Sequence, residues 1–535
     1  MAKRPGGFEL VLAPRDARTP AHRWLYGALR AAILRGRLRP GARLPSTRNL
    51  AVQYGLSRGT VVAAFAQLIA EGYISGTVGS GTYISAVLPD ELLQVAALAG
   101  PEGPAPAAPR RLSRRAALVA AFPAIEPRPL RAFRPNLPAL DQFPTALWAQ
   151  LASRRLRRAS LRMLIGCDNA GYAPLRAAVA DYLAAARGVA CHPDQVLIVS
   201  GIQEALDLVA RLALDPGDAV CMEDPGYGGA RRVFLAAEAR IVTAPVDDEG
   251  MRLPPARQLR GVRLAYVTPA HQYPLAVAMS LPRRLALLAW ARDAGALVFE
   301  DDYDSEFRYA GRPLPALQSL DRGGGQIIFA GTFAKVLFPS LRLGYLVAPG
   351  DLVDRLTAAL SLIHRHAPLL DQTVVCDFIV EGHFGRHLRR MRQLYAERLA
   401  VLMECAQRQL AGRLELSPVE AGLHTIGWLA DGITGEAAAR AAAARDVEVV
   451  PLGRFHRGAM QRDGLQLGFA AVGPREIRRG VDDLARALER ARVTAGEPQA
   501  AQAAAQARSA DSGPRPRPTP RRPGRRRGRA SAARA

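Results

Sequence analysis

The 535-residue sequence predicts a multidomain protein in which a small winged helix-turn-helix is followed by a large α/β domain. Within residues 15–86, two short helical patterns separated by a glycine precede a Gly-rich pair of β runs. Residues 131–492 alternate buried strand-like runs with helical patterns, which is typical of a mostly parallel sheet covered on both faces. The Ala-, Pro- and Arg-rich segments 89–130 and 493–535 indicate a linker and a disordered tail.

The charge balance favours a polyanionic partner. The formal net charge is +24, and nucleic acid is the first partner that such an excess suggests. Residues 508–534 hold ten arginines and one acidic residue, Asp511, so the tail accounts for part of the excess and the remainder of the chain is still basic. We expect the tail to add affinity for phosphate without sequence preference.

Several classes of protein are excluded by composition. The sequence contains no run of about 18 apolar residues, which is the length needed to cross a membrane. The five cysteines are scattered without a C-x-x-C pair, which predicts a reducing compartment with neither a disulfide framework nor a zinc site. The first residues lack the apolar run of a signal peptide. We therefore expect a cytoplasmic protein with no membrane partner and no metal.

The N-terminal segment has the features of a DNA reader. Residues 20–35 have apolar side chains at helical spacing. Ser46 and Ser57 are each placed to cap a short helix. Arg58 and Thr60 open the second of these helices, at the end that usually faces bases in the major groove. The same pattern also fits a structural helical hairpin with surface arginines.

The large domain offers a candidate for each group that pyridoxal 5'-phosphate (PLP) needs. Lys335 follows a predicted strand in an apolar run, which would lower its pKa and favour imine formation. Thr332 lies three residues before it, and Arg342 lies seven after. The acids and tyrosine of F-E-D-D-Y-D end another strand, where ligands bind in open α/β sheets. Taken alone, the lysine could be a surface residue, and the acids could form a loop or a Mg²⁺ site.

Three more motifs follow predicted strands. Gly201 opens a helix whose free N–H groups could bind phosphate. Tyr227 in E-D-P-G-Y-G could stack on a cofactor ring. The H-Q-Y-P motif brings His271 or Tyr273 to the same edge of the sheet. Each motif alone also fits a plain turn with a satisfied aromatic residue.

The N-terminal motifs L-P-S-x-R, S-R-x-T-V and G-x-G-T-Y closely resemble the winged helix of GntR-superfamily regulators. The resemblance implies contacts to double-stranded operator DNA and a wing tip near the Gly-rich turn. The implied DNA-contacting residues are Arg48, Ser57, Arg58 and Thr60, with Gly79 and Ser80 at the wing tip.

G-Y-A-P-L-R-A-A-V-A-D-Y-L, H-Q-Y-P, E-D-D-Y-D-S-E-F-R-Y and the lysine segment resemble fold-type I PLP-dependent aminotransferases, specifically the MocR branch of GntR regulators. The resemblance implies Lys335 as the catalytic Schiff-base lysine and Asp301 opposite the pyridine nitrogen. It also implies cofactor contacts around the ring and the phosphate. These residues are Tyr303 on the phenolic oxygen, Tyr227 over the ring, His271 beside it, and Arg342, Thr332, Gly201 and Gln203 around the phosphate.

Three positions depart from the family pattern. Gly166 stands where a tyrosine of the partner subunit would contact the phosphate. Ala276 replaces the usual glycine after H-Q-Y-P. Gln466 or a neighbour stands where aminotransferases place a carboxylate-binding arginine, and a neutral amide binds a carboxylate less strongly.

The resemblance implies a PLP-dependent, homodimeric transcription regulator. An amine or amino-acid effector would form an aldimine with the cofactor and alter promoter binding by the paired winged helices. One alternative is a catalytically active aminotransferase with an appended DNA-binding domain. Another is a DNA-binding protein whose large domain is an empty dimerisation scaffold.

Overall fold

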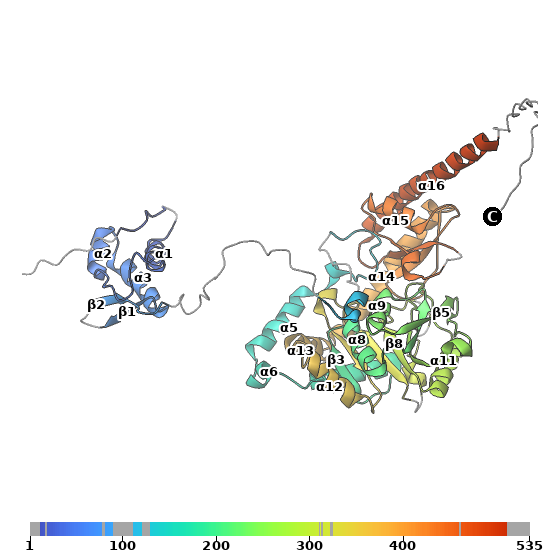
Figure 1. Cartoon of the computed structure of the whole chain (residues 1–535), viewed down its shortest axis with the longest axis horizontal. Helices are drawn as coiled ribbons and strands as arrows, with labels where there is room; N and C mark the ends of the chain where they lie inside the picture. The colour runs from blue at the N-terminus through green and yellow to red at the C-terminus, as the bar shows by residue number, and fades with distance from the viewer. Residues whose placement is uncertain are drawn as a thin grey trace, which may run out of the picture. The chain divides into compact units, whose positions relative to one another are not determined.

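The computed structural model of the chain forms two compact units, Met1–Arg111 and Leu112–Ala535 (Figure 1). Each unit is described by itself. The structure describes the residues 11–16, 19–77, 81–88, 111–119, 129–309, 311, 314–321, 325–458 and 462–510, with the side chains of the last helix described as far as Arg492.

The small unit is a winged helix-turn-helix, as predicted. The Oγ atoms of Ser46 and Ser57 accept hydrogen bonds from the N–H groups of Asn49 and Thr60, at 3.2 and 3.1 Å. These bonds satisfy N–H groups that have no partner inside the helix. Side chains from all three helices, such as Leu25, form one buried core. The elements are α1 (Ala21–Leu34), α2 (Thr47–Gln53), α3 (Arg58–Ala70) and the antiparallel pair β1 (Ile74–Thr77) and β2 (Gly81–Ile84).

An eight-stranded sheet forms the centre of the large unit within its described residues. The central strands are parallel, whereas β10 is inserted antiparallel between β3 and β9. The predicted strands are all present, and β5 and β6 extend the sheet beyond them. The spatial order is β3 (Val196–Val199), β10 (Gly344–Val347), β9 (Ile327–Thr332), β8 (Leu297–Asp302), β7 (Val262–Val267), β4 (Ala219–Asp224), β5 (Arg240–Asp247) and β6 (Gly250–Met251).

Helices cover both faces of this sheet, because successive strand residues point to opposite sides. In β4, for example, Val220 joins one core cluster and Cys221 joins another. One face packs against α8 (Ile202–Ala213), α9 (Gly228–Ala236) and α12 (Val353–Ile363). The other packs against α7 (Ala173–Arg187), α11 (Leu281–Ala294) and α13 (Leu369–Val380). This arrangement confirms the predicted α/β class.

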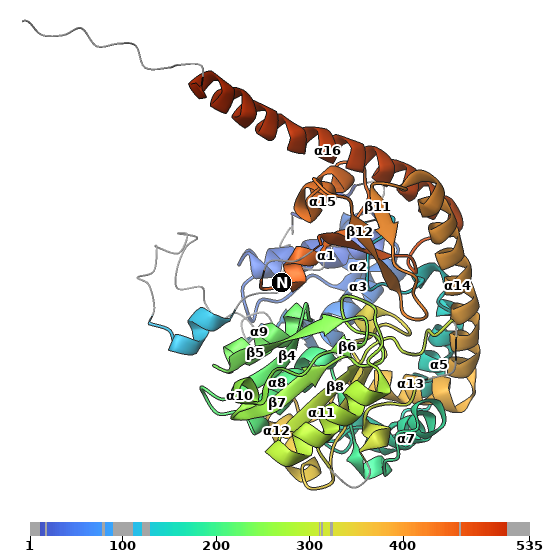
Figure 2. The same cartoon turned by 90° about the vertical axis from the view of Figure 1, so that its right-hand side faces the viewer.

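A smaller antiparallel sheet, which the sequence analysis did not predict, completes the large unit. Its order is β11 (Leu414–Leu416), β12 (His424–Leu429), β14 (Gly464–Gly468) and β13 (Val450–Pro451). The accompanying helices are α14 (His383–Gln409), α15 (Gly435–Ala443) and α16 (Pro474–Ala510). As Figure 2 shows, α16 packs against both α14 and α15. The shorter helices are α5 (Thr145–Arg157), α6 (Leu161–Ile165) and α10 (Ala256–Leu259).

Two boundaries differ from expectation. Part of the predicted linker is structured, since Arg114–Leu118 forms a 3-10 helix and Nε of Arg115 lies 2.7 Å from a carboxylate oxygen of Glu238. Part of the expected disordered tail is helical, since α16 continues through residues 493–510. Alanine has the highest helix propensity, and this stretch is alanine-rich. Residues 511–535 lie outside the described part of the chain. Across the described residues, no helix combines the length and apolar character needed to cross a bilayer.

Candidate functional site

Lys335 lies just beyond β9 and is one of only two lysines among the 72 basic residues of the chain; the other is Lys3. Its Nζ donates a hydrogen bond to the carbonyl oxygen of Asn136 at 2.9 Å. Burial lowers the pKa of Lys335 to about 8, although Asp304 and Asp301 oppose the shift. Arginine cannot form an imine at neutral pH, because its guanidinium stays charged. A lysine retained in so arginine-rich a chain, with its pKa lowered, therefore indicates amine chemistry.

Asp301 lies near the end of β8, where it is almost fully buried. Its Oδ2 accepts a 2.6 Å hydrogen bond from the hydroxyl of Tyr266. Its Oδ1 is buried and has no hydrogen-bond partner. Burial raises the pKa of Asp301 to about 7. A protonated ring nitrogen would supply the missing donor and would favour the ionised carboxylate.

Aromatic side chains surround the same place. Tyr227 immediately precedes α9, and its hydroxyl accepts a 3.0 Å hydrogen bond from Nε2 of Gln203 in α8. The ring of Tyr273 lies 5.7 Å from that of Tyr227 and 5.8 Å from that of Tyr303, edge-on to both. Tyr227 and Tyr303 are each partly exposed, so a planar ligand could reach them.

His271 and Asp304 form a buried pair next to the hydroxyl of Tyr303. Nδ1 of His271 lies 2.9 Å from Oδ1 of Asp304 and 3.0 Å from the Tyr303 hydroxyl. A proton on Nδ1 is donated to the carboxylate, so the Tyr303 hydroxyl keeps its hydrogen for another acceptor. The sequence analysis placed His271 at the cofactor, and this geometry suits a residue that orients Tyr303.

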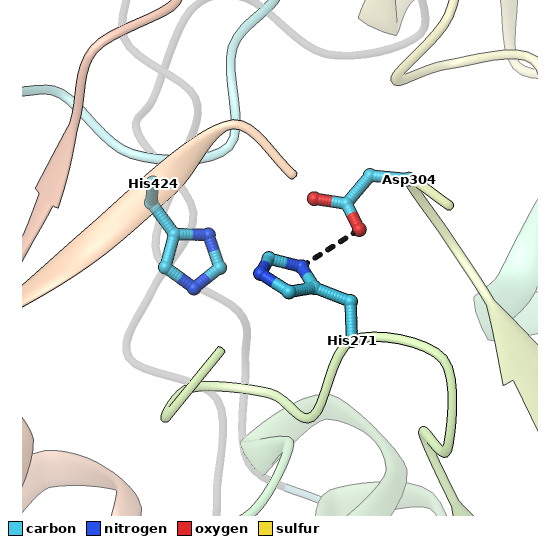
Figure 3. Close-up of side chains that lie close together, drawn as sticks. All are labelled: His271, Asp304 and His424. Atoms are coloured by element: carbon cyan, nitrogen blue, oxygen red, sulfur yellow. Dashed lines mark hydrogen bonds and ion pairs between the residues drawn. The ribbon is translucent and has the colours of Figure 1, made fainter. Parts of the chain in front are cut away.

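His424 of β12 completes this buried cluster, which Figure 3 shows. The ligand atoms of His271, Asp304 and His424 lie within 4.8 Å of one another, close enough for a group that could hold a cation. Both carboxylate oxygens of Asp304 already have hydrogen-bond partners, since Oδ2 accepts from the N–H of Leu423 at 3.2 Å. We therefore interpret His271 and Asp304 as a hydrogen-bonded pair, with the ring of His424 packed 5.1 Å from that of His271.

The start of α8 has the features of a phosphate cup. Gly201 precedes the helix with φ +115° and provides no side-chain cap. A Cβ at this position would lie 3.3 Å from a guanidinium nitrogen of Arg342. A Cβ at Gly344, in β10, would lie 3.3 Å from Cα of Gly201 and 3.7 Å from Cα of Thr332. The geometry thus brings the predicted phosphate residues together at a helix N-terminus, a favourable place for an anion.

These residues fit PLP. The unpartnered Oδ1 of Asp301 suits the pyridine nitrogen, Lys335 suits the aldehyde carbon, and the cup at Gly201 suits the phosphate. Sequence reasoning missed Asn136 and Tyr266, which hold these groups from distant parts of the chain. The scarcity of lysine was a signal available in the composition.

The three departures have structural counterparts. A Cβ at Gly166 would lie 2.8 Å from Nε2 of His366, so a tyrosine there would displace that imidazole. Ala276 has φ +63°, a region that favours glycine. Gln466 is fully buried in β14, and its Oε1 lies 3.4 Å from the hydroxyl of Tyr273.

In the small unit, Arg48 and Arg58 line one surface hollow of about 470 Å³ between α2 and α3. The side-chain oxygens of Ser57 and Thr60 are hydrogen-bonded at 2.8 Å, and Ser57 also caps α3 by accepting from the N–H of Thr60. A Cβ at Gly81, at the start of the wing strand β2, would lie 2.7 Å from Nε of Arg43, a cation that the sequence analysis did not single out. The predicted wing-tip residues Gly79 and Ser80 lie outside the described residues.

Comparison with known proteins identifies both parts of the chain. Residues 22–84 match the bacterial regulatory proteins of the gntR family, and residues 139–484 match aminotransferase class I and II. The chain is 40% identical to the probable rhizopine catabolism regulatory protein MocR of Rhizobium meliloti, across 89% of this chain and 95% of that protein. It is 33% identical to the regulator TauR of Rhodobacter capsulatus, across 89% of this chain and 98% of TauR.

A solved structure matches the large unit. The α-aminoadipate aminotransferase LysN of Thermus thermophilus, crystallised with N-(5'-phosphopyridoxyl)-L-leucine, is 33% identical with a TM-score of 0.62. The match covers 67% of this chain and 91% of LysN. The large unit therefore has the fold of an aminotransferase family that depends on PLP. The chain belongs to the MocR-like branch of the GntR family, whose members are transcription regulators that join a winged helix-turn-helix to an aminotransferase-like domain.

Proposed function

We propose that this regulator binds PLP at Lys335 and senses a primary amine there. The observation that carries the proposal is the presence, at one site, of the buried amine of Lys335 and of Asp301, whose buried Oδ1 has no hydrogen-bond partner. PLP, when bound, would supply an aldehyde that reacts with primary amines. Lys335 would hold the cofactor, Asp301 would keep a proton on the ring nitrogen, and Tyr303 would donate to the phenolic oxygen.

The remaining predicted residues have positioning roles in this proposal. Tyr227, held by Gln203, would pack on the ring, and His271 would orient Tyr303. Gly201, Thr332 and Arg342 would bind the phosphate. An amine effector that takes the place of Lys335 would free its Nζ and so change the contact with Asn136.

DNA binding would respond because the effector binds two arrangements of the protein with different affinity. We propose a homodimer, which would present two winged helices to two half-sites of operator DNA. Arg48 and Arg58 would contact the phosphates or bases, with Ser57, Thr60, Gly79 and Ser80 beside them.

The test is attachment of the cofactor. Full-length protein is incubated with PLP, reduced with borohydride and digested, and the modified lysine is identified by mass spectrometry. Adduct on Lys335, its loss in Lys335→Ala, and its retention in Lys3→Arg are expected. The same variants are tested for a change in operator affinity on adding amines. Adduct on Lys3 alone, or an unchanged amine response in Lys335→Ala, would refute the proposal.

Turnover separates this proposal from an active aminotransferase. Sustained conversion of an amino acid and a keto acid would favour the enzyme, and a single spectral change without turnover would favour the sensor. A cofactor-free protein that still binds its operator would favour the empty scaffold.

A further inference from the structure

Gln466 and His424 lie on the same face of the small sheet, beside the candidate cofactor site. Gln466 pairs with Ile426 across β14 and β12, and His424 is two residues before Ile426. Residues two apart on a strand point to the same side, so the two side chains are diagonal neighbours. Both are fully buried.

Each of the two side chains has one hydrogen-bonding atom without a partner. Oε1 of Gln466 accepts from the Tyr273 hydroxyl, whereas its Nε2 is buried and has no partner. Nε2 of His424 lies 3.0 Å from the carbonyl oxygen of Pro274 and must carry the proton, because a carbonyl only accepts. Nδ1 of His424 is then a buried lone pair with no partner. Burial lowers the pKa of His424 to about 3, so the ring stays neutral.

A chain of hydrogen bonds links this pair of groups to Lys335. Nζ of Lys335 donates to the backbone oxygen of Asn136 at 2.9 Å, and Nδ2 of Asn136 donates to the Tyr273 hydroxyl at 3.0 Å. That hydroxyl donates in turn to Oε1 of Gln466 at 3.4 Å, which assigns the orientation of the amide. These bonds place Lys335 and Gln466 in one network, and Lys335 also lies close enough to His424 to contribute to the lowering of its pKa.

An unpaired donor and an unpaired acceptor from diagonal neighbours on one face of the sheet match a hydroxyl group, which both accepts and donates. A carboxylate only accepts, so it would leave Nδ1 of His424 unpaired at a cost of about 1–3 kcal/mol. The negative charge of a carboxylate would also be repelled by Asp304 and Asp301, the two acids whose charges raise the pKa of Lys335. The cation that acts on Lys335 is Arg342, which lies at Gly201 in the phosphate cup.

We propose that the effector is a primary amine bearing a neutral hydroxyl group instead of a carboxylate, and that Gln466 and His424 recognise this hydroxyl. The inference rests on the proposed function and specifies the effector class of that site.

The test uses full-length protein loaded with PLP and two matched pairs of probes. These are 4-amino-1-butanol with 4-aminobutanoate, and 3-amino-1-propanol with β-alanine. Half-saturation is read from the cofactor absorption and, independently, from operator affinity. We expect the amino alcohol of each pair to half-saturate at a concentration at least about tenfold lower than the amino acid.

Substitution of Gln466 tests its role. Gln466→Arg should reverse the preference, because a guanidinium binds a carboxylate through two hydrogen bonds. Gln466→Met, which keeps the volume without the donor, should bring the ratio near one. Gln407→Arg adds the same charge on the exposed surface of α14 and should leave the ratio unchanged. Cofactor absorption and thermal melting establish that each variant is folded.

Several outcomes would overturn the inference. These are a wild-type preference for the amino acids, a ratio that Gln466→Arg does not move, and no response to either pair while PLP remains on Lys335. In these cases the cofactor assignment survives. Absence of PLP from Lys335 would instead refute the proposed function itself.

Discussion

The hydroxyl of Tyr266 donates a 2.6 Å hydrogen bond to Oδ2 of Asp301 and leaves Oδ1 of that buried carboxylate without a partner. The two residues lie on adjacent parallel strands, β7 and β8. This relationship orients one oxygen and reserves the other for a donor outside the chain. The hydrogen bond from Tyr266 favours the ionised carboxylate and opposes burial, which raises the pKa of Asp301 to about 7.

Asp301→Asn should therefore weaken PLP binding at least about tenfold, since an amide cannot pair with a protonated ring nitrogen. The cofactor absorption should also shift. Equilibrium titration of the apoprotein with PLP measures the affinity. Asp293→Asn, on the exposed surface of α11, removes a carboxylate away from the site and serves as the control. Equal affinities of the two variants would contradict the assigned role of Asp301.

Loading of PLP should depend on pH through Lys335. Only the neutral amine attacks an aldehyde, and burial lowers the pKa of Lys335 to about 8. The loading rate should rise about tenfold per unit below that pH and level off above it, whereas an amine of ordinary pKa, about 10.4, would keep rising. Stopped-flow absorbance of the apoprotein measures the rate. N-acetyl-lysine amide, followed in parallel, corrects for the titration of PLP itself. A rate that keeps rising to pH 10 would contradict this prediction.

Arg48→Ala and Arg58→Ala should each weaken operator binding about tenfold and reduce the salt slope by about one if the lost contact is to phosphate. Both arginines line the same exposed hollow, so the substitutions should leave folding intact. Fluorescence anisotropy over a range of salt concentrations measures both quantities. Arg257→Ala, in the exposed part of α10 in the large unit, is the control. Unchanged affinity in both variants would place the DNA-binding surface elsewhere.

The buried ion pair between Arg187 and Asp302, 2.7 Å apart, should be needed for stability. Arg187→Leu leaves the carboxylate buried and uncompensated, which costs about 3–5 kcal/mol. Urea unfolding followed by tryptophan fluorescence measures the change. The exposed pair of Arg211 and Asp207 has the same 2.7 Å separation, so Arg211→Leu should cost less than about 1 kcal/mol. Similar losses in the two variants would show that burial does not set the value of the pair.

Ala276→Gly should stabilise the protein by about 1 kcal/mol, because Ala276 has φ +63° and alanine is strained in this region. Ala184→Gly, on the exposed face of α7, is the matched control and should destabilise by about 1 kcal/mol. Thermal melting of the two variants gives the sign of each effect. A loss of stability in both would contradict the strain assigned to Ala276.

Local patterns in the sequence determined the elements and the residue types at their ends. Alternating apolar runs predicted the central strands, and Ser46 and Ser57 predicted two helix caps, because strand periodicity and capping depend on neighbours in the chain. The motifs also placed Lys335 just after one strand and Asp301 at the end of another, where ligands bind in α/β sheets. The small sheet was not predicted, because glycines and polar residues such as Gly427 and Gln466 interrupt the apolar runs of its main strands.

The tertiary structure alone decided which distant residues meet. Tyr266 reaches Asp301 because β7 lies beside β8 in a particular register. Asn136 lies 199 residues from Lys335, and Tyr273 lies 193 residues from Gln466. Hydrogen bonds across such separations depend on strand order and on packing between the two sheets, which no local spacing encodes. The sequence therefore predicted which residues carry the chemistry of the site, and the tertiary structure determined which distant residues orient them.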